Sequence, residues 1–178
     1  GPITAKFLAS CGGPEITSFG DPAAIISRIL PLQREKTNGR VALIRHTNHD
    51  RIPLVLPENF DELSILCSHP LKIIDLIQEI HKYEEVVTSA LHVLIICQSY
   101  GIPCSLVTFE GLENSISGSG LKYSDYSLGV GLKEIQPIVI GRDLRETNLN
   151  TTRQLEGISE SKKDEIEERI LRCIETLR

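Results

Sequence analysis

The residues best suited to chemistry lie in one segment, Val86 to Ser105, which reads VVTSALHVLIICQSYGIPCS. A β-branched run leads into Thr88 and Ser89, whose hydroxyls are typical helix caps, and an apolar stretch containing His92 follows. The amino end of a helix carries about half a positive charge and free N–H groups, so it attracts anions. If Ser89 caps this helix, His92 is the third residue of its first turn. A histidine there can bind a phosphate or pass a proton to a reacting carbon.

The same histidine also has a simpler interpretation, because a lone histidine in an apolar helix is more often a satisfied core residue than a ligand-binding group. The other isolated cationic residues are interpreted as surface groups. His49, His69 and His81 have no partner motif and are predicted to lie on the surface. Arg28 and the pair Lys162-Lys163 are predicted to be ordinary solvated charges.

Alternating strands and helices must position this segment. Apolar runs predict strands over residues 40–44, 63–67, 84–88, 104–109 and 137–140. Amphipathic or fully apolar patterns predict helices over residues 23–30, 70–83, 90–100 and 161–177, and polar composition predicts loops over 33–39 and 111–120. Strand and helix alternate from 40 to 109, which indicates βαβ units. The sequence therefore predicts an α/β fold, a Rossmann-like three-layer α/β/α arrangement with a mainly parallel sheet.

Short signals mark several element ends. Asp21-Pro22 predicts a capped helix start, Gly101 predicts a helix end, and Ser161 with Asp164 predicts a capping box for the last helix. Residues 6–9, near the start of the chain, are interpreted as a short strand-like stretch.

Polar side chains follow four of the predicted strands, as Arg45-His46, Cys67-Ser68, Thr88-Ser89 and Phe109-Glu110. The carboxyl ends of parallel strands meet at one edge of a sheet, which is where ligands bind in such folds. Arg45 and His46 are therefore predicted to contact a ligand, with an ordinary polar loop as the alternative.

Composition limits the classes of function. The 178 residues, 40% of them hydrophobic, predict a single domain over 1–178. A net charge of −5 argues against nucleic-acid binding. No run approaches the roughly 20 apolar residues of a membrane span and no signal peptide is visible, so a cytoplasmic protein is expected. Five cysteines without a CxxC pair predict reduced thiols, with neither a disulfide framework nor a zinc site.

Four segments, in order, resemble the polysaccharide pyruvyl transferase family over residues 20–132. Ser89-Ala90-Leu91-His92-Val93, followed by Gly101-Ile102-Pro103, resembles a Ser-x-Leu-His-Gly segment that leads through an apolar helix to Gly-x-Pro. Gly20-Asp21-Pro22-Ala23 resembles the Gly-Asp-Pro-Ala junction before the C-terminal domain of the family. Leu121-Lys122-Tyr123-Ser124-Asp125-Tyr126 resembles a Phe-Lys-Phe-x-Asp-Tyr segment, and Ile44-Arg45-His46 stands where the family has a strand ending in Pro-His.

The resemblance implies transfer of a pyruvyl group, as a cyclic ketal, from phosphoenolpyruvate to a sugar of a cell-surface polysaccharide. It implies His92 as the catalytic residue, which binds the donor phosphate or protonates its enol carbon, and Ser89 as a group that holds donor oxyanions. Lys122 would complement the charge of the donor, with a solvated surface lysine as the alternative. Tyr126 would either contact substrate or pack the segment. The chemistry implies no metal and no cofactor.

The family fold consists of two Rossmann-like halves in a glycosyltransferase-like (GT-B) arrangement, and the resemblance assigns this chain to the C-terminal half. Residues 1–20 would then be a remnant of, or junction to, a missing N-terminal domain or partner chain that holds the carbohydrate acceptor. Residues 159–178 form a C-terminal amphipathic helix, and its apolar stripe of Ile166, Ile170, Ile174 and Leu177 could drive a homodimer.

Departures from the family pattern keep two alternatives open. Val93 replaces a glycine, and Ala90 stands where many members carry Arg or Ser, which removes a possible bidentate phosphate contact. The first alternative is a non-catalytic binding domain of the same fold with a degenerate donor site. The second is half of a nucleotide-sugar glycosyltransferase, although the chain lacks the usual acidic and Gly-rich donor signatures.

Overall fold

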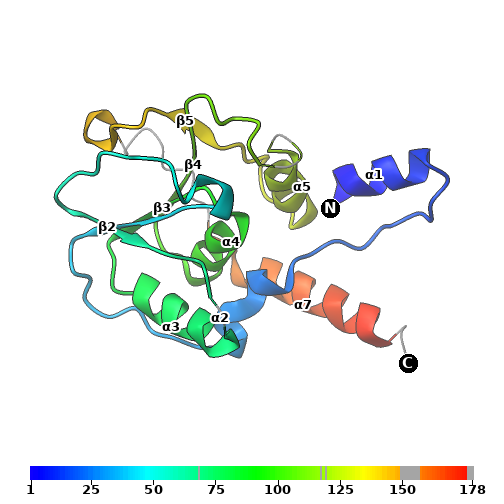
Figure 1. Cartoon of the computed structure of the whole chain (residues 1–178). Helices are drawn as coiled ribbons and strands as arrows, with labels where there is room; N and C mark the ends of the chain where they lie inside the picture. The colour runs from blue at the N-terminus through cyan, green and yellow to red at the C-terminus, as the bar shows by residue number, and fades with distance from the viewer. Residues whose placement is uncertain (68, 117, 119, 149–156, 176–178) are drawn as a thin grey trace.

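The computed structural model describes residues 1–67, 69–116, 118, 120–148 and 157–175 (Figure 1). Five parallel strands form one sheet in the order β2-β1-β3-β4-β5. The strands are β1 (Val41–Ile44), β2 (Phe60–Leu63), β3 (Glu85–Thr88), β4 (Cys104–Phe109) and β5 (Ile138–Ile140). The longer helices are α1 (Pro2–Ser10), α3 (Pro70–Ile80), α4 (Leu91–Tyr100), α5 (Leu121–Gly129) and α7 (Glu160–Glu175). The predicted α/β class and parallel sheet are confirmed, and the arrangement is consistent with a Rossmann-like fold.

The three central strands are buried on both faces, which explains their continuous apolar sequences. Alternate residues of β1 serve different cores: Ala42 and Ile44 pack with α3 and α4, while Val41 and Leu43 pack on the opposite face. Among the described residues, that opposite face is covered by partly buried side chains from Ile52 to Leu56 and by the 3₁₀-helix η3 (Leu144–Glu146).

Edge position explains the one misplaced strand. A strand was predicted over 63–67, but β2 spans Phe60–Leu63 and the following residues form a loop. β2 lies at the edge of the sheet, and of its residues only Phe60 is buried, so its sequence (FDEL) lacks the apolar run that marks the central strands. The strand-like stretch 6–9 is also wrong, because these residues lie inside helix α1.

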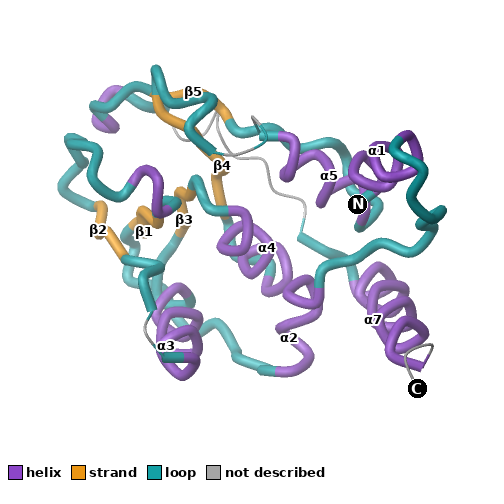
Figure 2. The backbone as a smooth tube through the Cα atoms, turned by 45° about the vertical axis from the view of Figure 1, so that its right-hand side comes forward, coloured by secondary structure: helices purple, strands orange, loops and turns teal. Residues whose placement is uncertain are grey.

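The chain before β1 packs against α4. Asp21 caps the 3₁₀-helix η1 (Pro22–Ile25) by accepting a hydrogen bond from Ala23 N at 2.9 Å, as predicted. η1 continues into α2 (Ile26–Ile29), and both pack on α4 (Figure 2).

The last helix packs on this domain. α7 contacts η1, and Ile166 is buried in a cluster with Ala24 and Ile95. Arg28 is no isolated charge, because it forms ion pairs with three carboxylates of α7, those of Glu160, Asp164 and Glu167.

Two further expectations for α7 need correction. Lys163 is buried and pairs with Glu160 at 2.8 Å, so it is not an ordinary solvated charge. The helix begins at Glu160, and Ser159 Oγ accepts from Lys162 N at 3.4 Å, so Ser161 lies inside the helix and is not its cap. Of the predicted stripe, Leu177 lies outside the described residues.

Candidate functional site

The site lies where the strand order reverses. The chain leaves β1 toward β2 on one side, and β3 pairs with the other side of β1. In open parallel sheets such a reversal leaves a crevice beyond the carboxyl ends of the two strands, and ligands bind there. His46 follows β1 and Ser89 follows β3 at this point. Their adjacency is direct, since His46 N donates a hydrogen bond to Ser89 Oγ at 2.9 Å.

The amino end of α4 opens at the same edge without a side-chain cap. Its N-cap residue is Ala90, so the predicted capping by Thr88 or Ser89 is wrong. Thr88 Oγ1 instead donates to Ile44 O at 2.7 Å and accepts from Ala90 N at 3.0 Å. The first N–H groups of a helix lack partners inside it, so the first turn of α4 keeps donors for a ligand. His92 is the second residue of that turn.

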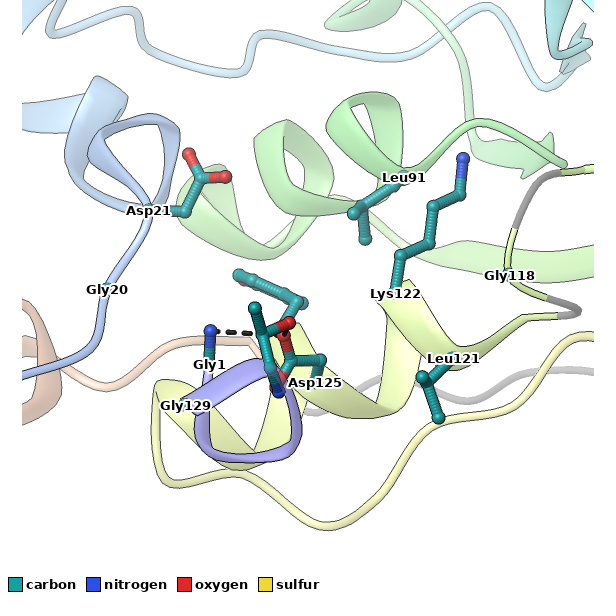
Figure 3. A pocket seen from close by; sticks show the side chains of 11 residues that line it. Gly1, Gly20, Asp21, Leu91, Gly118, Leu121, Lys122, Asp125 and Gly129 are labelled. Carbon is teal, nitrogen blue, oxygen red and sulfur yellow. Dashed lines mark hydrogen bonds and ion pairs between the residues drawn. The ribbon is translucent and has the colours of Figure 1, made fainter. Parts of the chain in front are cut away.

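The side chains of His92 and Lys122 both lie at this end of α4. The side chain of His92 is 75% exposed, and its Nε2 lies 3.8 Å from Asp21 Oδ2. Lys122 comes from the first turn of α5, and Figure 3 shows its side chain extending toward Leu91. His92 is therefore a surface group at a helix terminus and not a satisfied core histidine.

A cavity of about 370 Å³ joins these groups. Its polar lining includes His46, His92 and Lys122. The rest of its wall is largely apolar, from Ile65, Ile73, Leu76, Val93 and Ile96. A second cavity of about 390 Å³, shown in Figure 3, shares Leu91 and Lys122 with the first and contains Asp21, Asp125 and Tyr126 in its wall.

The local electrostatics favour an anion in the first cavity. Burial lowers the pKa of the Lys122 ammonium, and its Nζ lies 5.2 Å from the centroid of the Tyr123 ring. Burial, and secondarily the charge of Lys122, lowers the pKa of His46. A bound anion would offset both effects, because it stabilises the charged forms of a lysine and a histidine.

Arg45, predicted to contact a ligand, is buried, and its guanidinium is bonded within the protein. Its side chain is 8% exposed and forms an ion pair with Glu62. One guanidinium nitrogen also donates to the carbonyl oxygens of His49 and Ile52, both at 2.7 Å. These bonds use the donors that a phosphate would need.

Ser89 is also enclosed, with no exposed surface. Its hydroxyl accepts from His46 N and lies 2.8 Å from His49 Nδ1, while its carbonyl accepts from Tyr123 Oη at 2.8 Å. Tyr126 has a similar packing role, since its buried hydroxyl donates to Gln98 Oε1 at 3.0 Å. Burial and the charge of Asp21 raise the pKa of Tyr126.

Two histidines predicted on the surface are buried instead. His49 is fully buried, and His81 is buried with Nδ1 2.7 Å from Ile77 O and its ring against Tyr100. His69 is exposed, as expected. Sequence reasoning missed His49 because the polar run Arg45–Asp50 resembles a solvated loop. The available signal was its position three residues after His46, beyond a central strand.

Within the described ranges, no group of three or more His, Cys, Asp or Glu side chains is arranged to hold a metal ion. In that same part of the chain, no helix is both long and apolar enough to cross a membrane. None of the cysteines, all of which lie in the described ranges, forms a disulfide bond, and Cys97 and Cys104 are buried.

Comparison of the chain with protein-family models, curated proteins and solved structures finds no significant match. The resemblance to the pyruvyl transferases therefore depends on the four motifs. Three of these motifs supply residues that line the first cavity, namely His46, His92 and Lys122, and the fourth supplies Asp21, whose Oδ2 lies 3.8 Å from His92 Nε2.

Proposed function

We propose that the chain binds phosphoenolpyruvate at the carboxyl edge of the sheet, as the donor side of a polysaccharide pyruvyl transferase. One observation carries the proposal: the uncapped amino end of α4 faces a cavity that also contains His46, His92 and Lys122. In this proposal the chain is the C-terminal half of a cytoplasmic two-domain, GT-B-like enzyme. The other half would supply the sugar acceptor.

The donor phosphate would lie against the first turn of α4. Free amides and the helix dipole favour an anion there, and Lys122 adds a full positive charge. Lys122 and His46 would together compensate the phosphate and carboxylate of the donor. The apolar wall formed by Ile73, Leu76 and Ile96 suits its uncharged methylene end.

His92 would act on the enol carbon. Protonation of the methylene carbon turns it into a methyl group and leaves the adjacent carbon electrophilic. One sugar hydroxyl adds to that carbon, the phosphate leaves, and a second hydroxyl closes the ketal. The diol loses two protons, of which one is balanced by the new methyl group and one passes to phosphate or solvent, so the transfer involves no net oxidation or reduction.

Ser89 and Arg45 serve this site by positioning. Their polar atoms are already satisfied within the protein, so a donor gains more from the amides of α4 and from Lys122. Tyr126 packs behind the second cavity through Gln98.

A binding domain without turnover is the competing proposal. Val93, where the family has Gly, is buried and lines the donor cavity, so its side chain takes up space there. His92 is largely exposed, and its Nε2 lies 3.8 Å from Asp21 Oδ2. In this proposal the chain still binds an anion but does not catalyse pyruvyl transfer.

Titration with phosphoenolpyruvate at low ionic strength tests the proposal. We expect saturable binding that weakens about tenfold to a hundredfold in Lys122→Ala, in line with the loss of roughly 1.5–3 kcal/mol from one charged hydrogen bond. Pyruvate, which lacks the phosphate, should bind much more weakly. Lys133→Ala, which changes an exposed lysine of the loop after α5, is the matched control.

Absence of binding by the wild type would contradict the donor site. Binding that is equal in wild type and His92→Ala would keep the site and remove the role of His92. Binding without pyruvyl transfer, when the missing half is supplied, would favour the binding domain.

A further inference from the structure

His49 is a fully buried histidine that the proposed chemistry does not use. It lies in the 3₁₀-helix η2 (Thr47–His49), and its ring packs edge-on against Phe109 with centroids 5.4 Å apart. Burial lowers its pKa to about 4, with further contributions from the nearby charges of His46, Arg45 and Lys122. Its imidazole is therefore neutral at pH 7, and both of its nitrogens are available for directional hydrogen bonds.

Both ring nitrogens of His49 belong to one hydrogen-bonded chain. Nδ1 lies 2.8 Å from Ser89 Oγ, which accepts from His46 N at 2.9 Å. Nε2 lies 2.7 Å from Ser115 Oγ, which donates to Leu112 O at 2.6 Å. The chain thus begins at a backbone N–H and ends at a backbone carbonyl.

The carbonyl end fixes every proton along this chain of hydrogen bonds. The carbonyl of Leu112 can only accept, so the Ser115 hydroxyl must donate to it and must itself accept from His49 Nε2–H. A neutral imidazole carries one N–H, so Nδ1 is bare and accepts from the Ser89 hydroxyl. One tautomer of His49 alone satisfies the chain.

The chain crosses between the segments that carry the anion site. His46 follows β1, Ser89 precedes α4, and Ser115 belongs to the segment between β4 and α5. Two more bonds follow the same path: Asn48 Nδ2 donates to Ser115 O at 2.8 Å, and Tyr123 Oη donates to Ser89 O at 2.8 Å.

We infer that His49 is a positioning residue that sets the distance between His46 and Lys122 at the anion site. It acts as an acceptor toward Ser89 and a donor toward Ser115, so it fixes the β1 loop against the segment that leads into α5. The link to ligand binding rests on the proposed function, whereas the link between His46 and Lys122 does not. Leucine in its place would fill similar space and break both bonds.

The tautomer of His49 gives the first test. ¹⁵N NMR of the free chain should show Nε2 protonated and Nδ1 bare from pH 5.5 to 8, without titration near pH 6.5. A protonated Nδ1, or titration near the ordinary value, would overturn the inference.

The titration of His46 gives a ligand-free test of positioning. Besides burial, the charge of Lys122 lowers the pKa of His46, so that pKa reports how close the two groups lie. We expect both Lys122→Ala and His49→Leu to raise the pKa of His46. The pKa of His46 in the double variant should be only slightly higher than in Lys122→Ala, because His49 affects His46 through the position of Lys122.

Ser115→Ala provides a second test if His49→Leu does not fold. It removes the hydrogen bond between His49 Nε2 and Ser115 Oγ and takes away little side-chain volume. It should also raise the pKa of His46, whereas His69→Leu, at an exposed histidine, should not. An unchanged pKa of His46 in every folded variant of His49 and Ser115 would overturn the inference.

Phosphoenolpyruvate binding separates this inference from the proposed function. If the wild type binds, Ser115→Ala should weaken binding about threefold to tenfold, corresponding to the loss of one hydrogen bond, and His69→Leu should leave it unchanged. Equal affinity of Ser115→Ala and wild type would overturn the inference. If the wild type does not bind, the proposed function fails, and the His46 titration still decides the positioning role.

Discussion

The backbone and hydroxyl of Ser89 hold three parts of the candidate site together. The hydroxyl contacts His46 N and His49, and the carbonyl accepts from Tyr123, the neighbour of Lys122. Ser89, which was predicted to contact the ligand, thus holds in place the segments that carry the other site residues. Its place at the end of a buried strand was predictable, but its enclosure was not, because burial depends on loops distant in sequence.

His49 should make stability depend on pH. The folded protein binds a proton at His49 with a pKa of about 4, while the unfolded chain binds it at the ordinary value of 6.5. The unfolded state therefore holds more protons between these values, and stability falls as pH drops through that window. We expect a loss of roughly 2–3 kcal/mol from this residue between pH 7 and pH 4.

Urea unfolding of wild type and His49→Gln at both pH values measures that contribution. The glutamine does not titrate, so the variant should lose less stability on acidification than the wild type. His69→Gln, at an exposed histidine, should lose as much stability on acidification as the wild type. The same pH dependence in all three proteins would contradict a buried neutral His49.

Among the elements, the sequence predicts helix α4 well and does not predict helix α5. The α4 run is apolar nearly all round, and Gly101 adopts a left-handed φ of 68° directly after it, so both its burial and its end follow from residue types. α5 was identified as a motif but not as a helix. Its buried face carries Ser124, Asp125 and Ser127, so no apolar period signals it.

The end of α4 gives a prediction of its own. Gly101→Ala should cost about 1–2 kcal/mol, because a side chain disfavours the left-handed region even where no atom lies near the new Cβ. Gly141→Ala is the matched control, with equally open space and no positive φ. Urea unfolding should separate the two variants. Equal stabilities would show that backbone conformation is not what ends the helix.

For the whole molecule, the βαβ pattern predicted the parallel sheet, while the tertiary contacts of the chain ends needed the structure. The edge strand β2 begins three residues before its predicted start, and the packing of α7 depends on contacts such as the ion pair of Arg28 with Glu167, which are 139 residues apart in sequence. No local pattern carries such pairings. The structure makes α7 part of the same core as α4.

Removing buried volume from α7 tests that arrangement. Ile166 is 1% exposed, so Ile166→Ala should destabilise the chain by about 2–4 kcal/mol. Leu171, on the same helix, is 53% exposed, and Leu171→Ala should change stability by less than about 0.5 kcal/mol. Equal, small effects in chemical unfolding would mean that α7 does not pack on this domain in solution.

The amide resonances of the first turn of α4 test the central claim most directly. During titration with phosphoenolpyruvate at low ionic strength, we predict saturable shifts at Leu91, His92 and Val93, with the side chain of Lys122 responding at the same concentration. Inorganic phosphate should shift the same amides at higher concentration. Unmoved amides at saturating phosphoenolpyruvate, or shifts confined to another part of the chain, would contradict a donor site at this end of the helix.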